Sequence, residues 1–75
     1  MQLRDAISLK KNQVLDQSQI KIDNDGCCLL FFRNKLTDQW LKLETYRHEI
    51  RRFKTAKAAF AAAKKVGFDE VLVKM

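Results

Sequence analysis

Apolar residues recur at helical spacing in one segment near the C-terminal end of the chain. They stand three or four positions apart, as on one face of an α-helix, at Ala56, Ala59, Phe60, Ala63 and Val66. Thr55 is a favourable N-cap because its hydroxyl can accept a hydrogen bond from a free backbone N–H. Gly67 favours a helix end, and Lys64 and Lys65 suit the negative end of the helix dipole. The pattern predicts a helix over about residues 55–66.

The segment before this helix shows the period of two that is typical of β-strands. The strands we expect cover Gln19–Asp23, Cys27–Arg33, Gln39–Tyr46 and Glu49–Lys54. The turn signals between them are Asn24-Asp25-Gly26, Asn34–Asp38 and Arg47-His48. Consecutive strands joined by short turns predict an antiparallel β-meander over about residues 19–54.

The two ends of the chain carry weaker patterns. In residues 2–16, Leu3, Ile7 and Val14 fit a helical stripe, although lysines stand where the stripe should continue, and we expect an N-terminal helix there. Glu70–Met75 alternates around its valines and predicts a final strand. The whole chain, residues 1–75, then forms one small α+β domain with the helix at about 55–66 packed on one face of the sheet. The residues expected to be buried together are Phe60, Ala59, Ala63, Leu41, Leu43, Phe53 and Val71.

Composition narrows the class of protein. A chain of 75 residues has a thin margin of stability, so association with another chain would add useful apolar burial. The net charge of +6 and the pI of about 9.6 favour polyanionic partners such as nucleic acid, or else a surface that serves solubility. The sequence contains no signal-peptide core and no long apolar run, so we expect a cytoplasmic protein without a membrane segment.

Few residues could carry catalysis. His48 is the one histidine, and its predicted turn offers no partner for nucleophilic chemistry. Gly26 and Gly67 are the only glycines, which excludes a glycine-rich phosphate loop. Cys27 and Cys28 are neighbours in a predicted strand, where side chains point to opposite faces, so we expect one in the core and neither in a disulfide. The sequence therefore predicts no enzyme, no cofactor and no metal site.

The predicted sheet face opposite the helix combines aromatic and basic side chains. If Leu41, Leu43 and Phe53 point inwards, their neighbours along the strands point outwards. This outward set consists of Trp40, Lys42, Tyr46, Arg52 and Lys54, with Arg33 and, in one register, Phe31 beside them. Proteins that bind single-stranded nucleic acid use aromatic rings to stack on bases and cations to hold phosphates. The alternative is that the aromatic residues belong to a dimer interface or a second core.

The helix offers a second basic surface, formed by Lys57, Lys64 and Lys65, with Lys54 just before the cap. Residues 54–65 resemble the last helix of double-stranded RNA-binding domains, which opens with lysines and continues in alanines. Here the lysine spacing is one residue short and a strand is expected where that family ends, so we do not assign the chain to it.

The sequence as a whole predicts a small non-enzymatic protein that binds nucleic acid, in a regulatory or accessory role that fits a bacterial, phage or plasmid setting. It does not decide between DNA and RNA or between single and double strands. The predicted binding residues are Arg33, Trp40, Lys42, Tyr46, Arg52, Lys54 and Lys57. The competing prediction is a protein–protein interaction module, a homodimer formed through strand edges or through the aromatic sheet face.

Overall fold

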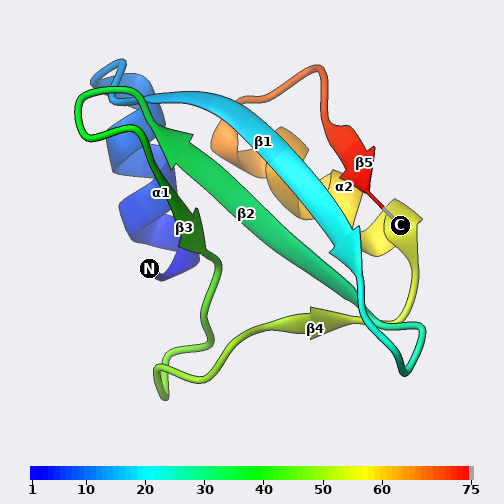
Figure 1. Cartoon of the computed structure of the whole chain (residues 1–75). Coiled ribbons are helices and arrows are strands. Elements are labelled where there is room, and N and C mark those ends of the chain that lie inside the picture. Colours follow the sequence, from blue (N-terminus) through cyan, green and yellow to red (C-terminus); the bar gives the residue numbers. More distant parts are fainter. Residues whose placement is uncertain (75) are drawn as a thin grey trace.

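The computed structural model describes residues 1–74, and its two helices lie side by side on one face of a mixed β-sheet (Figure 1). The elements in chain order are α1 (Leu3–Lys11), β1 (Leu15–Ile22), β2 (Cys28–Asn34), β3 (Gln39–Lys42), β4 (Arg52–Phe53), α2 (Ala56–Val66) and β5 (Leu72–Lys74). Among these strands the order is β3-β2-β1-β5, and β4 pairs with β2 beyond the end of β3. This arrangement confirms the predicted α+β class, with a meander, a helix on one face, an N-terminal helix and a C-terminal strand.

The direction of each strand follows from its connection. The first three strands are antiparallel because short turns join them, whereas β5 runs parallel to β1. Helix α2 connects β4 to β5 and crosses the covered face of the sheet between them (Figure 1). A helix of this length lets the chain return in the same direction on the far side of β1.

The turn between β1 and β2 forms where the sequence predicts it. One carboxylate oxygen of Asp23 accepts hydrogen bonds from the backbone N–H groups of Asp25 and Cys27, each at 2.9 Å. Gly26 has a φ of 80°, in the left-handed region that a residue with a side chain rarely adopts. The local bonds of this loop thus fix the register of the two longest strands.

Helix α2 begins and ends as its caps predict. The Thr55 hydroxyl accepts from the N–H of Ala58 at 3.1 Å, and Gly67 has a φ of 119°. The N–H of Gly67 donates to the carbonyls of Ala63 and Lys64 at 3.2 and 3.0 Å, which closes the last turn.

The face that α2 turns to the sheet differs from the prediction at one important residue. Ala59, Ala63 and Val66 are buried, but Phe60 is 37% exposed, so its predicted place in the core is wrong. The small alanines bring the helix close to the sheet. The aromatic volume comes instead from Phe68, 6% exposed, whose ring centroid lies 5.5 Å from that of Phe32. The chain reverses at Gly67, and this turn carries Phe68 back under the sheet.

The remaining predicted core residues are distributed as expected, with some exposure at the margins. Leu43 and Phe53 are buried, while Leu41 and Val71 are half-buried and pack against the core. The two helices therefore cover a continuous apolar layer on one face of the sheet.

The N-terminal region forms a shorter helix and a longer strand than predicted. α1 ends at Lys11, and Gln13 has a φ of 61°, which turns the chain sharply before β1 begins at Leu15. Val14 thus lies outside the helix, contrary to the predicted stripe. A bulge between Leu15 and Gln17 keeps both Leu15 and Ser18 on the covered face.

Strands β3 and β4 are much shorter than the predicted segments Gln39–Tyr46 and Glu49–Lys54. The reason is the single edge of β2 that β1 leaves available. β3 pairs with Phe31–Asn34 on this edge and β4 pairs with Cys28 and Leu29, so the two strands share it end to end. The chain between them leaves the sheet, and only one isolated bridge, Glu44 with Ile50, remains of the predicted strand pair.

Candidate nucleic-acid interface

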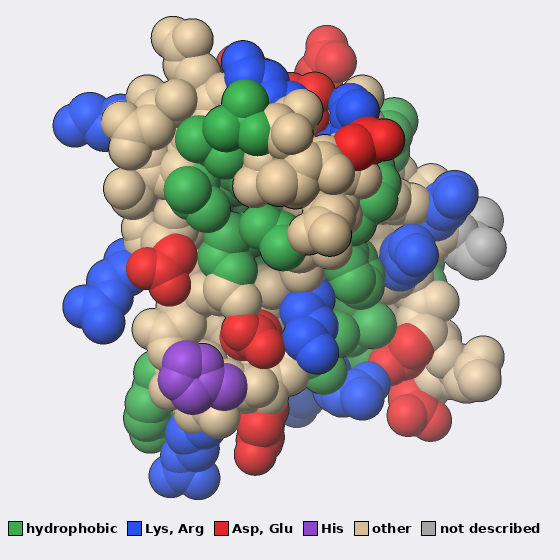
Figure 2. Space-filling view, turned by 60° about the vertical axis from the view of Figure 1, so that its left-hand side comes forward, with side chains coloured by type: hydrophobic (Ala, Val, Ile, Leu, Met, Phe, Trp, Pro, Cys, Tyr) green, Lys and Arg blue, Asp and Glu red, His purple; other side chains and the backbone are tan. Residues whose placement is uncertain are grey.

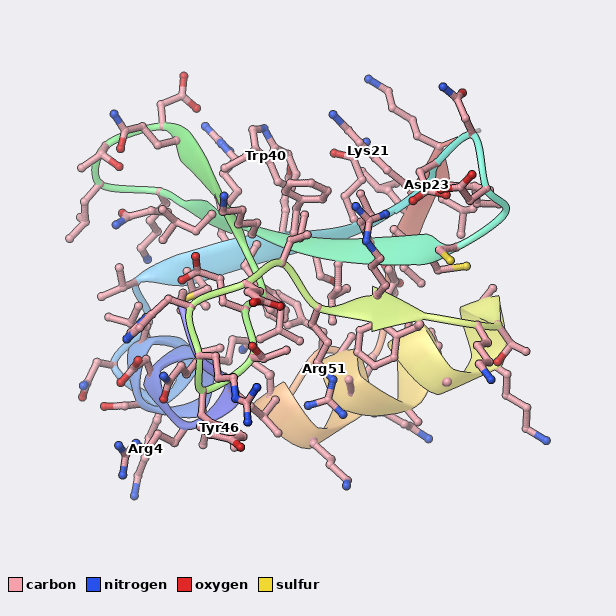
Figure 3. All side chains as sticks on the ribbon, turned by 90° about the horizontal axis from the view of Figure 1, so that it is seen from below. Arg4, Lys21, Asp23, Trp40, Tyr46 and Arg51 are labelled. Atoms are coloured by element: carbon pink, nitrogen blue, oxygen red, sulfur yellow. The ribbon has the colours of Figure 1, made fainter. Side chains whose placement is uncertain are left out.

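The face of the sheet opposite the helices carries the aromatic and basic residues that the strand pairing brings together. Arg33 of β2 lies opposite Trp40 of β3, and Phe31 lies opposite Lys42. Phe31 and Trp40 are therefore diagonal neighbours on one face, within reach of each other for large side chains. Figure 3 shows Trp40 above the sheet, with both helices below it. We call this surface the sheet face.

Two aromatic rings on the sheet face differ in their access to solvent. Trp40 is 41% exposed, whereas Phe31 is half-buried. The Lys21 ammonium lies 5.2 Å from the centroid of the Phe31 ring, which places a positive charge directly at an aromatic surface. Lys74 of β5 pairs in register with Lys21 and extends the basic strip towards the other sheet edge.

The two arginines of the sheet face are held by carboxylates. Arg33 forms ion pairs with Asp16, at 3.1 Å, and with Asp38, and its Nε donates to Asp38 at 2.8 Å. The hydrogen bond to Asp38, opposed by partial desolvation, raises the pKa of Arg33 above its ordinary value. Arg52 is paired with Asp23. A phosphate would have to compete with these carboxylates for both guanidinium groups.

The lysines of the sheet face, unlike its arginines, are not paired with carboxylates in the described part of the chain. Within residues 1–74, no ion pair engages Lys21, Lys42 or Lys74. Ammonium groups without carboxylate partners are the ones best able to contact phosphates, because no existing pair must first be broken.

Three predicted site residues lie away from the sheet face. Tyr46 lies in the connection between β3 and β4 and points to the helix side of the sheet (Figure 3). The alternation of side chains that would place Tyr46 on the same face as Trp40 ends because β3 stops at Lys42. Lys54 is exposed in the bend before α2, and Lys57 is exposed on α2 itself. The structure thus brings together Arg33, Trp40, Lys42 and Arg52, and it separates them from the other three.

Sequence reasoning missed Lys21 and Lys74 as members of this face. The alternation Ile20-Lys21-Ile22 contains the signal, since Ile20 is buried against the helices and its neighbour must point the other way. No sequence pattern pairs Arg33 with Asp16 or Arg52 with Asp23, because these contacts depend on how the strands assemble.

Other sites of chemistry are sparse in the described part of the chain. Cys28 is buried, Cys27 is half-buried, and both are free thiols. His48 is exposed in a turn with a φ of 66°. Between residues 1 and 74, no group of three or more His, Cys, Asp or Glu side chains is arranged to hold a metal ion. Over the same residues, no helix has the length and apolar character needed to span a bilayer.

Comparison of the chain with protein-family models, with curated proteins and with solved structures finds no significant match.

Proposed function

We propose that the protein binds single-stranded nucleic acid through the sheet face, as a non-enzymatic regulatory or accessory protein. The observation that carries this proposal is the diagonal pair Phe31 and Trp40 on an uncovered sheet surface, with the lysines Lys21 and Lys42 beside them. Each base stacked on an aromatic ring contributes about 1–3 kcal/mol of binding free energy. Paired bases in a duplex present no free faces to such rings, which favours a single strand.

The lysines of α2 add a second, weaker contribution. Lys57, Lys64 and Lys65 are exposed on the helix and carry positive charge on the opposite side of the molecule. Such lysines attract phosphates without reading sequence, and their effect falls steeply with salt. We place the protein in the cytoplasm, where nucleic acid is present and where the free thiols of Cys27 and Cys28 stay reduced.

Fluorescence of Trp40 during titration with short single-stranded oligonucleotides tests the proposal, because this is the only tryptophan of the chain. We expect quenching at low salt and weaker binding as salt is added. Since the mutation removes the fluorophore, binding by Trp40→Ala is measured with a labelled oligonucleotide, and it should lose about 1–3 kcal/mol of binding free energy.

Two further variants complete the test, one as a control and one for the contribution of charge. Leu36→Ala removes an exposed apolar side chain from the turn before β3 and should bind like the parent. Lys42→Gln should weaken binding to all sequences and lower the slope of log affinity against log salt by about one. Absence of quenching, together with no affinity for any oligonucleotide, would exclude the proposal.

A homodimer is the second candidate, and the outer edge of β5 favours it. Leu72 and Val73 are 59% and 56% exposed, and no described strand pairs with β5 on its outer side. Viewed from the side of α1 and β3, hydrophobic side chains also form a patch bordered by charged ones (Figure 2). A solution mass of twice the chain mass that is insensitive to salt would favour this candidate over nucleic-acid binding.

A further inference from the structure

A cleft lies on the helix side of the sheet, away from the sheet face. Its volume is about 490 Å³, and it forms where the start of α1 meets the connection between β3 and β4. The residues that line it are Gln2, Leu3, Arg4, Glu44, Thr45, Tyr46 and Arg51. In Figure 3, Arg4, Tyr46 and Arg51 all lie below the sheet, with Tyr46 between the two arginines, whereas Trp40 and Lys21 lie above it. We infer that this cleft binds a nucleotide, with its phosphate held by the arginines of the lining, Arg4 and Arg51, and its base against Tyr46.

The charges of the cleft favour an anion. Arg4 and Arg51 both line it, and across residues 1–74 neither forms an ion pair with a carboxylate. Glu44 is the only acidic residue of the lining, and it is already paired with the N-terminal ammonium group. Two guanidinium groups without carboxylate partners leave the lining of the cleft positively charged. A planar guanidinium group can donate two parallel hydrogen bonds to two oxygens of one phosphate.

The side chain and the backbone of Arg51 are both held by contacts with neighbouring residues. Its guanidinium group lies 5.1 Å from the centroid of the Phe53 ring, and Phe53 is buried in the core. The N–H of Arg51 donates to the carbonyl of Leu43 at 2.9 Å, so the backbone is fixed as well. A side chain held in this way loses less conformational entropy when it binds a ligand.

Tyr46 supplies a surface for a base. The residue is 76% exposed, and the Arg47 guanidinium lies 5.8 Å from the centroid of its ring. The side-chain amide of Gln2 donates to the Tyr46 carbonyl at 3.2 Å, which ties the turn to the start of α1. An exposed ring on an anchored turn is a stacking platform, and the volume of the cleft lies within the range of small-molecule sites.

The inference is independent of the sheet face, because it uses none of its residues. The cleft recognises a phosphate group joined to a base, and the probe that represents this chemistry is adenosine monophosphate. Adenosine lacks the phosphate and inorganic phosphate lacks the base, so the three compounds separate the two halves of the proposed site.

The experiment is a titration of the isotope-labelled protein with each compound at constant ionic strength, followed through its backbone amide resonances. We expect adenosine monophosphate to shift the amides of residues 3–5 and 45–51 and to leave the Trp40 indole resonance in place. The double variant Arg4→Gln, Arg51→Gln should weaken this binding by about tenfold or more. Both residues are exposed, so this variant should fold. Lys35→Gln in the turn between β2 and β3 is the matched control, because it removes one exposed positive charge away from the cleft, and it should bind like the parent.

Two comparisons decide the role of each group. Tyr46→Ala should weaken the binding of adenosine monophosphate and leave that of inorganic phosphate unchanged. Trp40→Ala should leave the cleft unaffected, even if the sheet face binds no oligonucleotide. Equal affinity for adenosine and adenosine monophosphate would overturn the phosphate site. Equal affinity for inorganic phosphate and adenosine monophosphate would overturn the base site, and shifts absent from residues 3–5 and 45–51 would overturn both.

Discussion

Truncation of two phenylalanines separates the helix orientation in the structure from the one that the sequence pattern suggests. Phe68 is 6% exposed and stacks on Phe32, whereas Phe60 is 37% exposed on α2. Phe68→Ala should remove about 3–5 kcal/mol of unfolding free energy, the usual cost of emptying an aromatic site in a core. The lost ring stacking accounts for about 0.5–1.5 kcal/mol beyond the buried area.

The same truncation at Phe60 should cost far less. A partly exposed ring contributes only part of the roughly 1.5–3 kcal/mol that full burial provides. Alanine is also the better helix former, by about 0.5 kcal/mol, which offsets some of the loss. We therefore expect Phe60→Ala to cost about 1 kcal/mol or less.

Urea unfolding followed by far-ultraviolet circular dichroism measures both variants. A chain of 75 residues has a total stability of roughly 4–11 kcal/mol, so the difference between the variants is a large part of the whole. If Phe68→Ala is unfolded even without urea, Phe68→Leu keeps most of the volume and should lose about 1 kcal/mol. A loss at Phe60 equal to or greater than that at Phe68 would show that α2 turns its predicted stripe to the sheet, contrary to the structure.

Three other expectations follow from single residues. Cys28→Ser should cost about 1–3 kcal/mol by thermal unfolding, because it buries a hydroxyl among apolar groups, while Cys27→Ser at a half-buried site should change stability little. Gly67→Ala should destabilise the fold by more than about 1 kcal/mol in urea, because the φ of 119° strains alanine and the new Cβ would lie 3.3 Å from Cγ of Lys10. The hydrogen bond from the N-terminal ammonium lowers the pKa of Glu44 below its ordinary 4.5, so its contribution to stability is present above pH 4.5 and is lost as the pH falls through the lowered value. Glu44→Gln should therefore flatten the acid side of the stability–pH curve, and an unchanged curve would contradict the ion pair.

Much of the sheet face was within reach of sequence reasoning. Alternation along a strand has a period of two, so inward Leu41 and Phe53 require outward Trp40, Lys42 and Arg52 wherever the strands persist. The prediction failed at Tyr46, which lies beyond the end of β3. The Arg4–Arg51 cleft had no local signal, because its residues come from distant parts of the chain.

The sequence by itself determined the turns and the ends of α2, because each depends on one or two residues and their neighbours. Asp23 and Gly26 form the first hairpin, and Thr55 and Gly67 bound α2, through local hydrogen bonds and backbone angles. Tertiary structure decided which aromatic residue fills the core, because α2 turns Ala59, Ala63 and Val66 to the sheet and the chain after Gly67 places Phe68 against Phe32. It also decided where β3 ends, since β2 has one available edge and two strands must share it.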